Sequence, residues 1–276
     1  MKSPLSLLAG IPDSHMWSSR TWTDYAELPH PEQVLAMLPL FGFADWGLGR
    51  PLELEEILGT AVINHARETG GPVMERLHIL PPLRQVLGPY PHSLFGIDFE
   101  TALDLIDHIA RGVAAAGLSR LLLFTTSPWN EELIDVAGRQ ARVRHGLQVF
   151  LSNLAALGLD LHPVRSPARE IVQCAACACL GELPAKAPPR AAPAYPAFRP
   201  GEIPWCPPLK FDMPLERAIA TGRANIADAG TRLAAIVAEI LDTPPRPRRK
   251  PPARNTPSNH GNNRGRAARH HRHRAS

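Results

Sequence analysis

The chain has 276 residues, 44% of them hydrophobic, which is enough for one large domain or two small ones. No stretch approaches the roughly 18 consecutive apolar residues of a membrane-spanning helix, and residues 1–12 lack the apolar core of a signal peptide. Four cysteines in a chain of this length do not form a disulfide scaffold, so we expect a cytoplasmic protein with no membrane contact. The net charge of +4 combines an acidic body with a basic C-terminus.

The elements that we predict for residues 1–243 form one domain. Residues 1–33 contain Trp17, Trp22 and Tyr25 and are expected to pack on the core as an ordered segment. Continuous apolar runs predict buried strands, and apolar residues at helical spacing predict helices. In chain order, we expect a strand at 34–43 despite Pro39, a helix at 54–69, a strand at 77–80, a helix at 99–116, a strand at 118–126, a helix at 131–144, a strand at 147–154, a proline-rich surface excursion at 183–214 and a helix at 214–241.

This alternation of strands and helices predicts an α/β fold with right-handed crossovers, in which helices cover both faces of a mainly parallel central sheet. In such a sheet, ligands bind beyond the carboxyl ends of the strands. Residues 42–56 follow the first strand there and contain four carboxylates that can bind a hard metal ion or transfer protons, namely Asp45, Glu53, Glu55 and Glu56. The three glutamates also suit the first turn of the helix at 54–69.

The second candidate segment, residues 125–132, follows the most apolar strand. Ser127, Asn130 and Glu131 can face the crevice and contact a ligand there. Helix-start chemistry explains the same residues equally well, with Ser127 as the N-cap and Pro128 as the first helical residue. The sequence contains no GxSxG motif around Ser127 and no phosphate-binding glycine motif, so neither an activated serine nucleophile nor a nucleotide site is expected.

The cysteines offer a further possibility. Cys174, Cys177 and Cys179 form a CxxCxC pattern, and Cys206 follows downstream. Four thiolates can hold zinc in a tetrahedral site. Small cysteines in an apolar, alanine-rich run are also common in protein cores, so the sequence leaves both interpretations open.

The order of these segments resembles the creatininase (creatinine amidohydrolase) family, over about residues 25–159 and the helix at 214–241. The resemblance implies a layered α/β fold, homo-oligomeric assembly, and hydrolysis of cyclic or formyl amides with two divalent metal ions. The family's first loop, PxGSxEQHGPHLPxxTD, compares with residues 39–55, PLFGFADWGLGRPLELE. In this comparison, the loop's ligand Glu, His and Asp positions are occupied by Ala44, Trp46 and Glu55.

The family's second loop, NGHGGN, compares with residues 125–130, TTSPWN. That segment keeps the asparagine as Asn130 and has Ser127 where the ligand histidine belongs. Alanine and tryptophan cannot bind Zn²⁺ or Mn²⁺, and serine is a poor substitute for imidazole. Without a metal ion that lowers the pKa of bound water, the family's hydrolytic route has no nucleophile.

The resemblance therefore implies a creatininase-like protein without the usual dinuclear centre, a non-canonical or inactive amidohydrolase homologue that binds a small molecule and needs no cofactor. Its candidate site residues are Glu55, His92, Ser127, Asn130 and Glu131. The alternative is an active metal-dependent amidohydrolase with zinc or manganese in a rebuilt ligand set. Asp45 and Glu55 are then the first metal ligands, joined by His92 and Glu131.

Residues 244–276 complete the chain. They contain ten Lys or Arg residues, no acidic residue, and no Leu, Ile, Val or aromatic residue. Such a segment has nothing to bury, so we expect a disordered basic tail. It can attract RNA or another polyanion weakly and without sequence specificity, or it can serve as a solubilising extension.

Overall fold

Four parallel strands form the central sheet, in the order β3-β1-β5-β6. The computed structural model describes residues 10–44, 50–85, 87, 93–162, 168–184 and 211–245, and statements on structure refer to these. The strands are β1 (Leu35–Leu40), β3 (Leu77–Ile79), β5 (Arg120–Thr125) and β6 (Gln148–Asn153). A separate antiparallel pair joins β2 (Phe43–Ala44) to β4 (Ser93–Leu94). Because the four strands of the central sheet are parallel, their carboxyl ends all lie at the same edge of that sheet.

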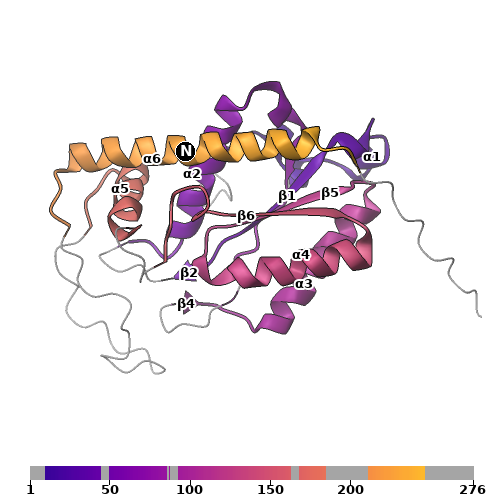
Figure 1. Ribbon diagram of the computed structural model, residues 1–276, viewed down its shortest axis with the longest axis horizontal. Coiled ribbons are helices and arrows are strands. Elements are labelled where there is room, and N and C mark those ends of the chain that lie inside the picture. The colour runs from indigo at the N-terminus through magenta and orange to yellow at the C-terminus, as the bar shows by residue number, and fades with distance from the viewer. Residues whose placement is uncertain are drawn as a thin grey trace, which may run out of the picture.

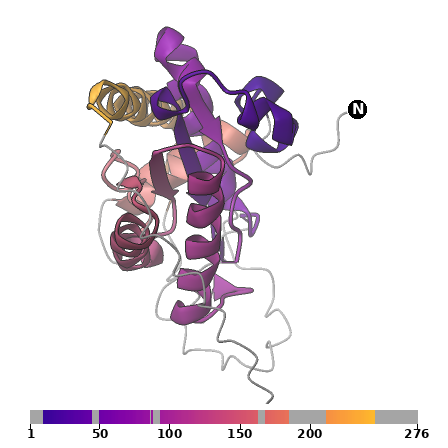
Figure 2. The same cartoon turned by 90° about the vertical axis from the view of Figure 1, so that its right-hand side faces the viewer.

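Helices cover both faces of this sheet (Figures 1 and 2). One layer contains α2 (Leu54–Thr69), α5 (Ala168–Leu180) and α6 (Leu215–Asp242), and the other contains α3 (Phe99–Ala115) and α4 (Glu131–His145). A short helix, α1 (Trp22–Ala26), lies in the N-terminal segment. Short 3-10 turns occur at Asp13–His15, Trp17–Ser19, Pro31–Gln33, Gly71–Arg76 and Pro128–Asn130. The predicted layered α/β architecture is confirmed.

Alternate residues of the strands enter two separate hydrophobic cores. Leu35, Met37 and Phe124 pack in the core with α2 and α6. Ala36 and Leu123 pack in the other core, against α3 and α4. Burial on both faces explains why β1 and β5 are apolar at nearly every position instead of alternating with polar residues.

Pro39 lies in a central strand, although proline usually occurs at sheet edges. The carbonyl of Pro39 accepts a hydrogen bond from the Leu83 amide at 2.9 Å, on the side of β3. In a β-strand, the N–H and C=O groups of one residue point toward the same adjacent strand. The N–H that Pro39 lacks would therefore also point toward the side of β3. β3 has already ended at Ile79, so no ladder bond is lost there.

Helix α6 packs closely on α5 and α2 at two of its glycines. A Cβ atom on Gly222 would lie 1.9 Å from the Cys174 carbonyl oxygen in α5, and one on Gly230 would lie 2.7 Å from the Cβ of His65 in α2. At the C-terminal end of α6, the guanidinium groups of Arg76 and Arg120 donate to the Leu241 carbonyl. These cations satisfy an otherwise unpaired helix carbonyl and oppose the negative end of the helix dipole.

The structure corrects three details of the sequence prediction. The CxxCxC run is part of helix α5, which was not predicted. Trp22 is 71% exposed, whereas Tyr25 is buried and stacks on Trp17 with ring centroids 4.1 Å apart, so only part of the N-terminal segment packs on the core. Ser127 stands at the N-cap of the 3-10 turn Pro128–Asn130, but its side chain accepts no capping hydrogen bond, and α4 begins only at Glu131.

Two predictions concern segments that the structure does not describe. Most of the proline-rich excursion, at 185–210, lies outside the described residues, as does the basic tail from residue 246 onward. Within the described part of the chain, no helix combines the length and apolarity that are needed to cross a membrane.

Replacement of Gly222 tests whether α6 must touch the backbone of α5. We expect Gly222→Ala to lower the free energy of unfolding by about 3 kcal/mol, because the new methyl group forces two packed helices apart. Gly112→Ala in α3 is the matched control, since its Cβ would meet nothing within 4 Å. It should be neutral or stabilising by up to about 1 kcal/mol. Urea unfolding followed by circular dichroism measures both, and equal stabilities would contradict the packing.

Candidate functional site

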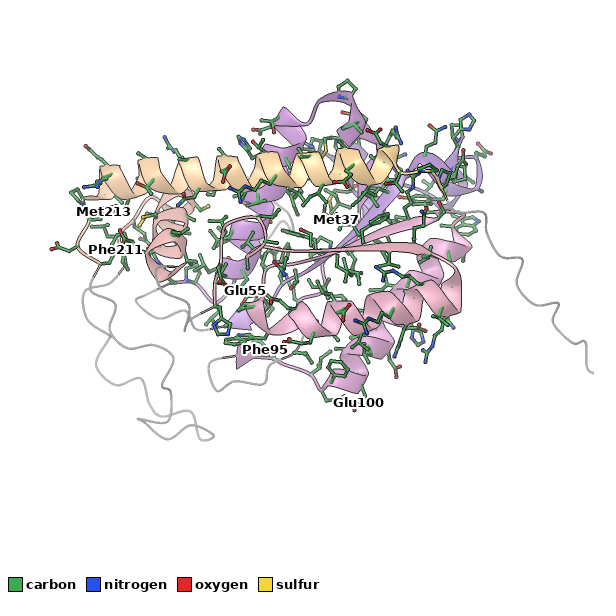
Figure 3. The ribbon with its side chains drawn as sticks, viewed as in Figure 1. Met37, Glu55, Phe95, Glu100, Phe211 and Met213 are labelled. Carbon is green, nitrogen blue, oxygen red and sulfur yellow. The ribbon has the colours of Figure 1, made fainter. Side chains whose placement is uncertain are left out.

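Glu55 lies where the sequence places a candidate ligand, at the carboxyl end of β1. It is in the first turn of α2, and its side chain is fully buried (Figure 3). Its Oε2 accepts a hydrogen bond from the Gly42 amide at 2.7 Å. A Cβ on residue 42 would approach this oxygen to 2.8 Å, so glycine leaves room for the carboxylate. The bond fixes the position of the Glu55 carboxylate against the backbone that follows β1.

Ser127 and Asn130 follow β5, which is the direct neighbour of β1 in the sheet. Both are buried, and they lie in the segment that connects β5 to α4. The Asn130 Oδ1 accepts a hydrogen bond from the Leu87 amide at 3.2 Å. Asn130 therefore connects the end of β5 to the chain that follows β3. Glu131, the first residue of α4, is partly buried.

Several buried polar atoms at this edge have no hydrogen-bond partner among the described residues. They include the Thr126 Oγ1, the Asn130 Nδ2 and the Ser152 Oγ. Thr126 and Asn130 follow β5, and Ser152 lies near the end of β6. Unpaired buried polar atoms are rare in native proteins, and bound water or a bound molecule commonly explains them.

The structure brings together only some of the predicted site residues. Glu55, Ser127 and Asn130 lie at the ends of two adjacent strands. Asp45 and His92 lie outside the described residues, as does Trp46. The predicted convergence of Asp45, Glu55, His92 and Glu131 on one metal ion therefore stays a prediction.

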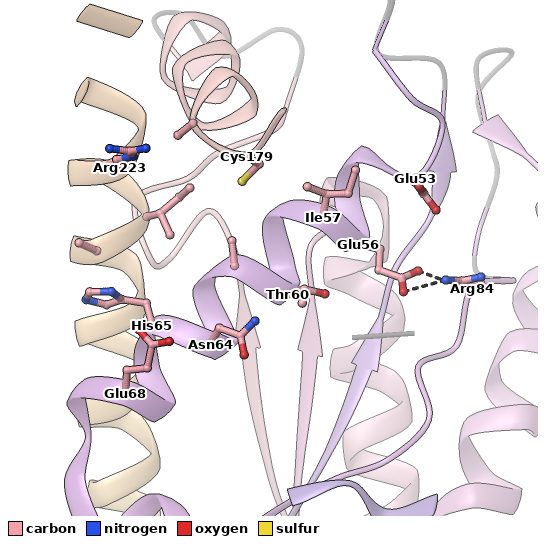
Figure 4. A pocket seen from close by; sticks show the side chains of 14 residues that line it. Glu53, Glu56, Ile57, Thr60, Asn64, His65, Glu68, Arg84, Cys179 and Arg223 are labelled. Carbon is pink, nitrogen blue, oxygen red and sulfur yellow. Dashed lines mark hydrogen bonds and ion pairs between the residues drawn. The ribbon is translucent and has the colours of Figure 1, made fainter. Parts of the chain in front are cut away.

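A pocket of about 650 Å³ lies along α2 (Figure 4), and its lining does not include Glu55, Ser127, Asn130 or Glu131. Its walls come from α2, α5 and α6, and from Arg84 in the chain after β3. The lining combines apolar and charged groups, and comprises Glu53, Glu56, Ile57, Thr60, Ala61, Asn64, His65, Glu68, Arg84, Ala178, Cys179, Arg223, Ile226 and Ala227. Its volume lies within the range of about 300–1,000 Å³ that is usual for small-molecule sites.

One end of the pocket carries a tight ion pair. Arg84 donates from Nε to Glu56 Oε2 at 2.6 Å and from Nη2 to Glu56 Oε1 at 2.8 Å. The Arg84 guanidinium carbon also lies 5.7 Å from the centre of the Phe43 ring, within reach of a cation–π interaction. Two parallel bonds and this ring fix the plane of the guanidinium, and its Nη1 makes no hydrogen bond among the described residues.

Sequence reasoning found two carboxylates of this pocket but missed Glu68 and the cations Arg84 and Arg223. Glu53 and Glu56 were already candidates, in the segment after the first strand. Arg84 has no motif that marks it, although its position four residues beyond a predicted strand was a usable signal. Arg223 and Cys179 come from helices that approach α2 only in the folded chain, so no local pattern could identify them.

The described residues do not provide a metal centre of the dinuclear kind. They contain no group of three or more His, Cys, Asp or Glu side chains that could hold a metal ion. Ala44 lies in β2 and offers a methyl group, and Ser127 offers a buried hydroxyl. Glu55 is the one described carboxylate at the compared ligand positions.

Comparison with solved structures identifies the architecture. The chain aligns with creatininase over 84% of its length and 100% of that chain, at a TM-score of 0.61 and 18% identity. The chain has a creatininase-like fold. A creatininase variant complexed with creatine aligns over 83% and 99% of the two chains, with a TM-score of 0.58 and 19% identity. A candidate creatinine amidohydrolase from Bacteroides fragilis aligns over 85% and 99%, with a TM-score of 0.61 and 14% identity.

At these identities, the likeness shows the fold alone. No protein-family model matches the sequence, and no curated protein matches it significantly. Creatininase structures include a manganese form and a form with two zinc ions. Ala44 and Ser127, which the loop comparison places at ligand positions, carry a methyl group and a hydroxyl group.

The thiol of Cys179 provides a chemical probe of the pocket. Burial raises its pKa to about 11, so at pH 8 almost all of it is the unreactive thiol. We expect alkylation by iodoacetamide to accelerate about tenfold per pH unit from pH 8 to 10, because the thiolate fraction grows by that factor below the pKa. Peptide mass spectrometry measures the rate at this residue. Alkylation in urea, where burial is lost, is the control, and a native rate that levels off by pH 9 would contradict the assignment.

Proposed function

We propose that this protein is a non-canonical or inactive homologue of creatinine amidohydrolases that binds a small polar molecule at the carboxyl edge of its sheet. The pocket that begins at Glu56 and Arg84 serves as the binding volume. No dinuclear metal centre takes part. The observation that supports this proposal most directly is the donor set, in which a methyl group and a buried hydroxyl occupy compared ligand positions and a single buried carboxylate remains.

This donor set suits hydrogen bonding better than metal binding. Zinc and manganese sites use His, Cys or several carboxylates. The described groups at the compared ligand positions are instead a methyl group, a hydroxyl group and the Glu55 carboxylate, which the Gly42 amide already holds. Unpaired buried atoms at Thr126, Asn130 and Ser152 add hydrogen-bonding capacity. A neutral molecule with amide or guanidino groups matches these donors and acceptors.

The pocket indicates the same ligand class. Ile57, Ala61 and Ile226 supply apolar area, and the Glu56–Arg84 pair supplies charge at one end. A ligand carboxylate or carbonyl can bind the Arg84 Nη1, while a ligand N–H can donate to Glu56 or Glu53. Creatinine and creatine, which the compared structures name, carry such groups and are the first compounds to examine.

Binding of creatinine and creatine can be measured by isothermal titration calorimetry. We expect Glu56→Gln to weaken the affinity by about tenfold or more, because it removes a charged acceptor and leaves Arg84 without its partner. Glu68→Gln, in the same pocket but on the last turns of α2, is the matched control and should change the affinity less than twofold. Equal effects of the two variants would contradict the position of the ligand, and no saturable binding of either compound would contradict the ligand class.

Elemental analysis separates the proposal from its alternative. We expect purified, tag-free protein to retain less than one zinc or manganese ion per chain after desalting, and to hydrolyse no creatinine when either ion is added. A chain without residues 246–276 is measured in parallel, because His270, His271 and His273 in the tail capture metals unspecifically. Two tightly bound ions per chain in both forms would instead support an active enzyme with the rebuilt ligands Asp45, Glu55, His92 and Glu131.

A further inference from the structure

Three sulfur-bearing side chains meet where α5 packs on the beginning of α6. Cys174 and Cys177 lie in α5 and are 1% and 0% exposed. Met213 lies just before α6, and its Sδ is 3.8 Å from the Cys174 Sγ. Figure 3 shows Met213 and Phe211 beside α5, at the end of the molecule away from α1. The surroundings are apolar and include Phe211, Leu215, Ala218 and Ile219.

A buried cation touches this cluster. Arg50 is almost fully buried, and its Nη2 donates to the Cys177 Sγ at 3.4 Å. Its other hydrogen bonds go to the Gln173 Oε1 at 2.9 Å and to the Glu182 carbonyl at 3.2 Å. All three acceptors are formally neutral when Cys177 carries its proton, and no described carboxylate pairs with Arg50. A buried cation without an anion is costly, so this position favours a bound group that brings negative charge.

The spacing of the sulfur atoms favours a shared ion over a disulfide. Residues three apart on a helix have Cβ atoms about 5–6 Å apart, whereas a disulfide requires about 3.5–4.5 Å. An ion with metal–sulfur bonds of about 2.3 Å holds two sulfur ligands about 3.8–4.0 Å apart in tetrahedral or trigonal geometry. The Cys174–Met213 separation of 3.8 Å already has this value.

We propose that Cys174, Cys177 and Met213 bind one soft monovalent metal ion of the Cu(I) type, with Arg50 as the balancing charge. Thiolate and thioether ligands select Cu(I), whereas zinc sites use cysteine, histidine or carboxylates and not methionine. Binding of Cu(I) releases the two thiol protons and changes no oxidation state. Two thiolates and Cu(I) together carry one negative charge, which the Arg50 guanidinium cancels, so the loaded site is neutral in its apolar surroundings.

This site is separate from the pocket of the proposed function. Cys179 follows on the same helix but lines that pocket, and the three described cysteines do not form a metal-binding group by themselves. Cys206, the fourth cysteine of the zinc site that the sequence left open, lies outside the described residues, so that site stays a prediction. Met213 is partly exposed, which gives an ion a path to the buried thiols.

Competition for Cu(I) with bathocuproine disulfonate under anaerobic conditions tests the proposal on the full reduced chain. We expect one Cu(I) per chain, an affinity that falls about 100-fold in Cys177→Ser, and one that falls about tenfold in Met213→Leu and Arg50→Gln. Cys179→Ser, a thiol removed from the same helix, should stay within twofold of the wild type. X-ray absorption of the loaded protein should show three sulfur ligands and no nitrogen ligand.

Equal competition by the wild type and a Cys174→Ser/Cys177→Ser double variant would overturn the proposal, as would copper bound only through nitrogen, which points to the tail histidines. Circular dichroism checks that each variant is folded. Met213→Leu keeps the test decisive if a cysteine variant does not fold, because Met213 lies outside the helices and leucine preserves the apolar volume.

Discussion

The close approach of α6 to α2 and α5 is the constraint on which both candidate sites depend. Gly222 lets this long helix meet the backbone of α5 directly, and Gly230 makes room for the His65 side chain of α2. The pocket is the space that remains where the three helices diverge, and the sulfur cluster is the point where α5 and α6 meet. Larger residues at either glycine would move the walls of both sites together.

Buried charged side chains join segments that are far apart in the sequence. Arg50 connects the chain before α2 to α5, Glu55 binds the backbone after β1, and Arg120 binds the end of α6 from the sheet. The described hydrogen-bond partners of Arg50 and Arg120 are neutral groups, so hydrogen bonds stabilise these two buried cations. Such an arrangement fixes geometry strictly, because a buried charge that loses its hydrogen bonds is costly.

A fold and a metal site place different requirements on a sequence. A fold of this kind persists at 14–19% identity because its requirements are general, namely apolar strands covered by amphipathic helices. Metal binding requires particular side chains at particular positions, so a shared fold does not by itself carry a metal site. Two expectations from the sequence remain predictions. They are homo-oligomeric assembly and the attraction of polyanions by residues 244–276.

The sequence by itself determined the elements and their order. Periodicity located α2, α3, α4 and α6 to within a few residues, and the apolar runs located the sheet strands, because burial on one stripe or on both faces leaves a local pattern. It also marked Glu55, Ser127 and Asn130 as neighbours at one sheet edge. Only the tertiary structure decided that Arg84 pairs with Glu56, that Cys179 faces a pocket, and that Met213 and Arg50 reach the thiols of α5. Those contacts join residues distant in sequence, and their geometry follows from how closely the helices pack, which no local pattern records.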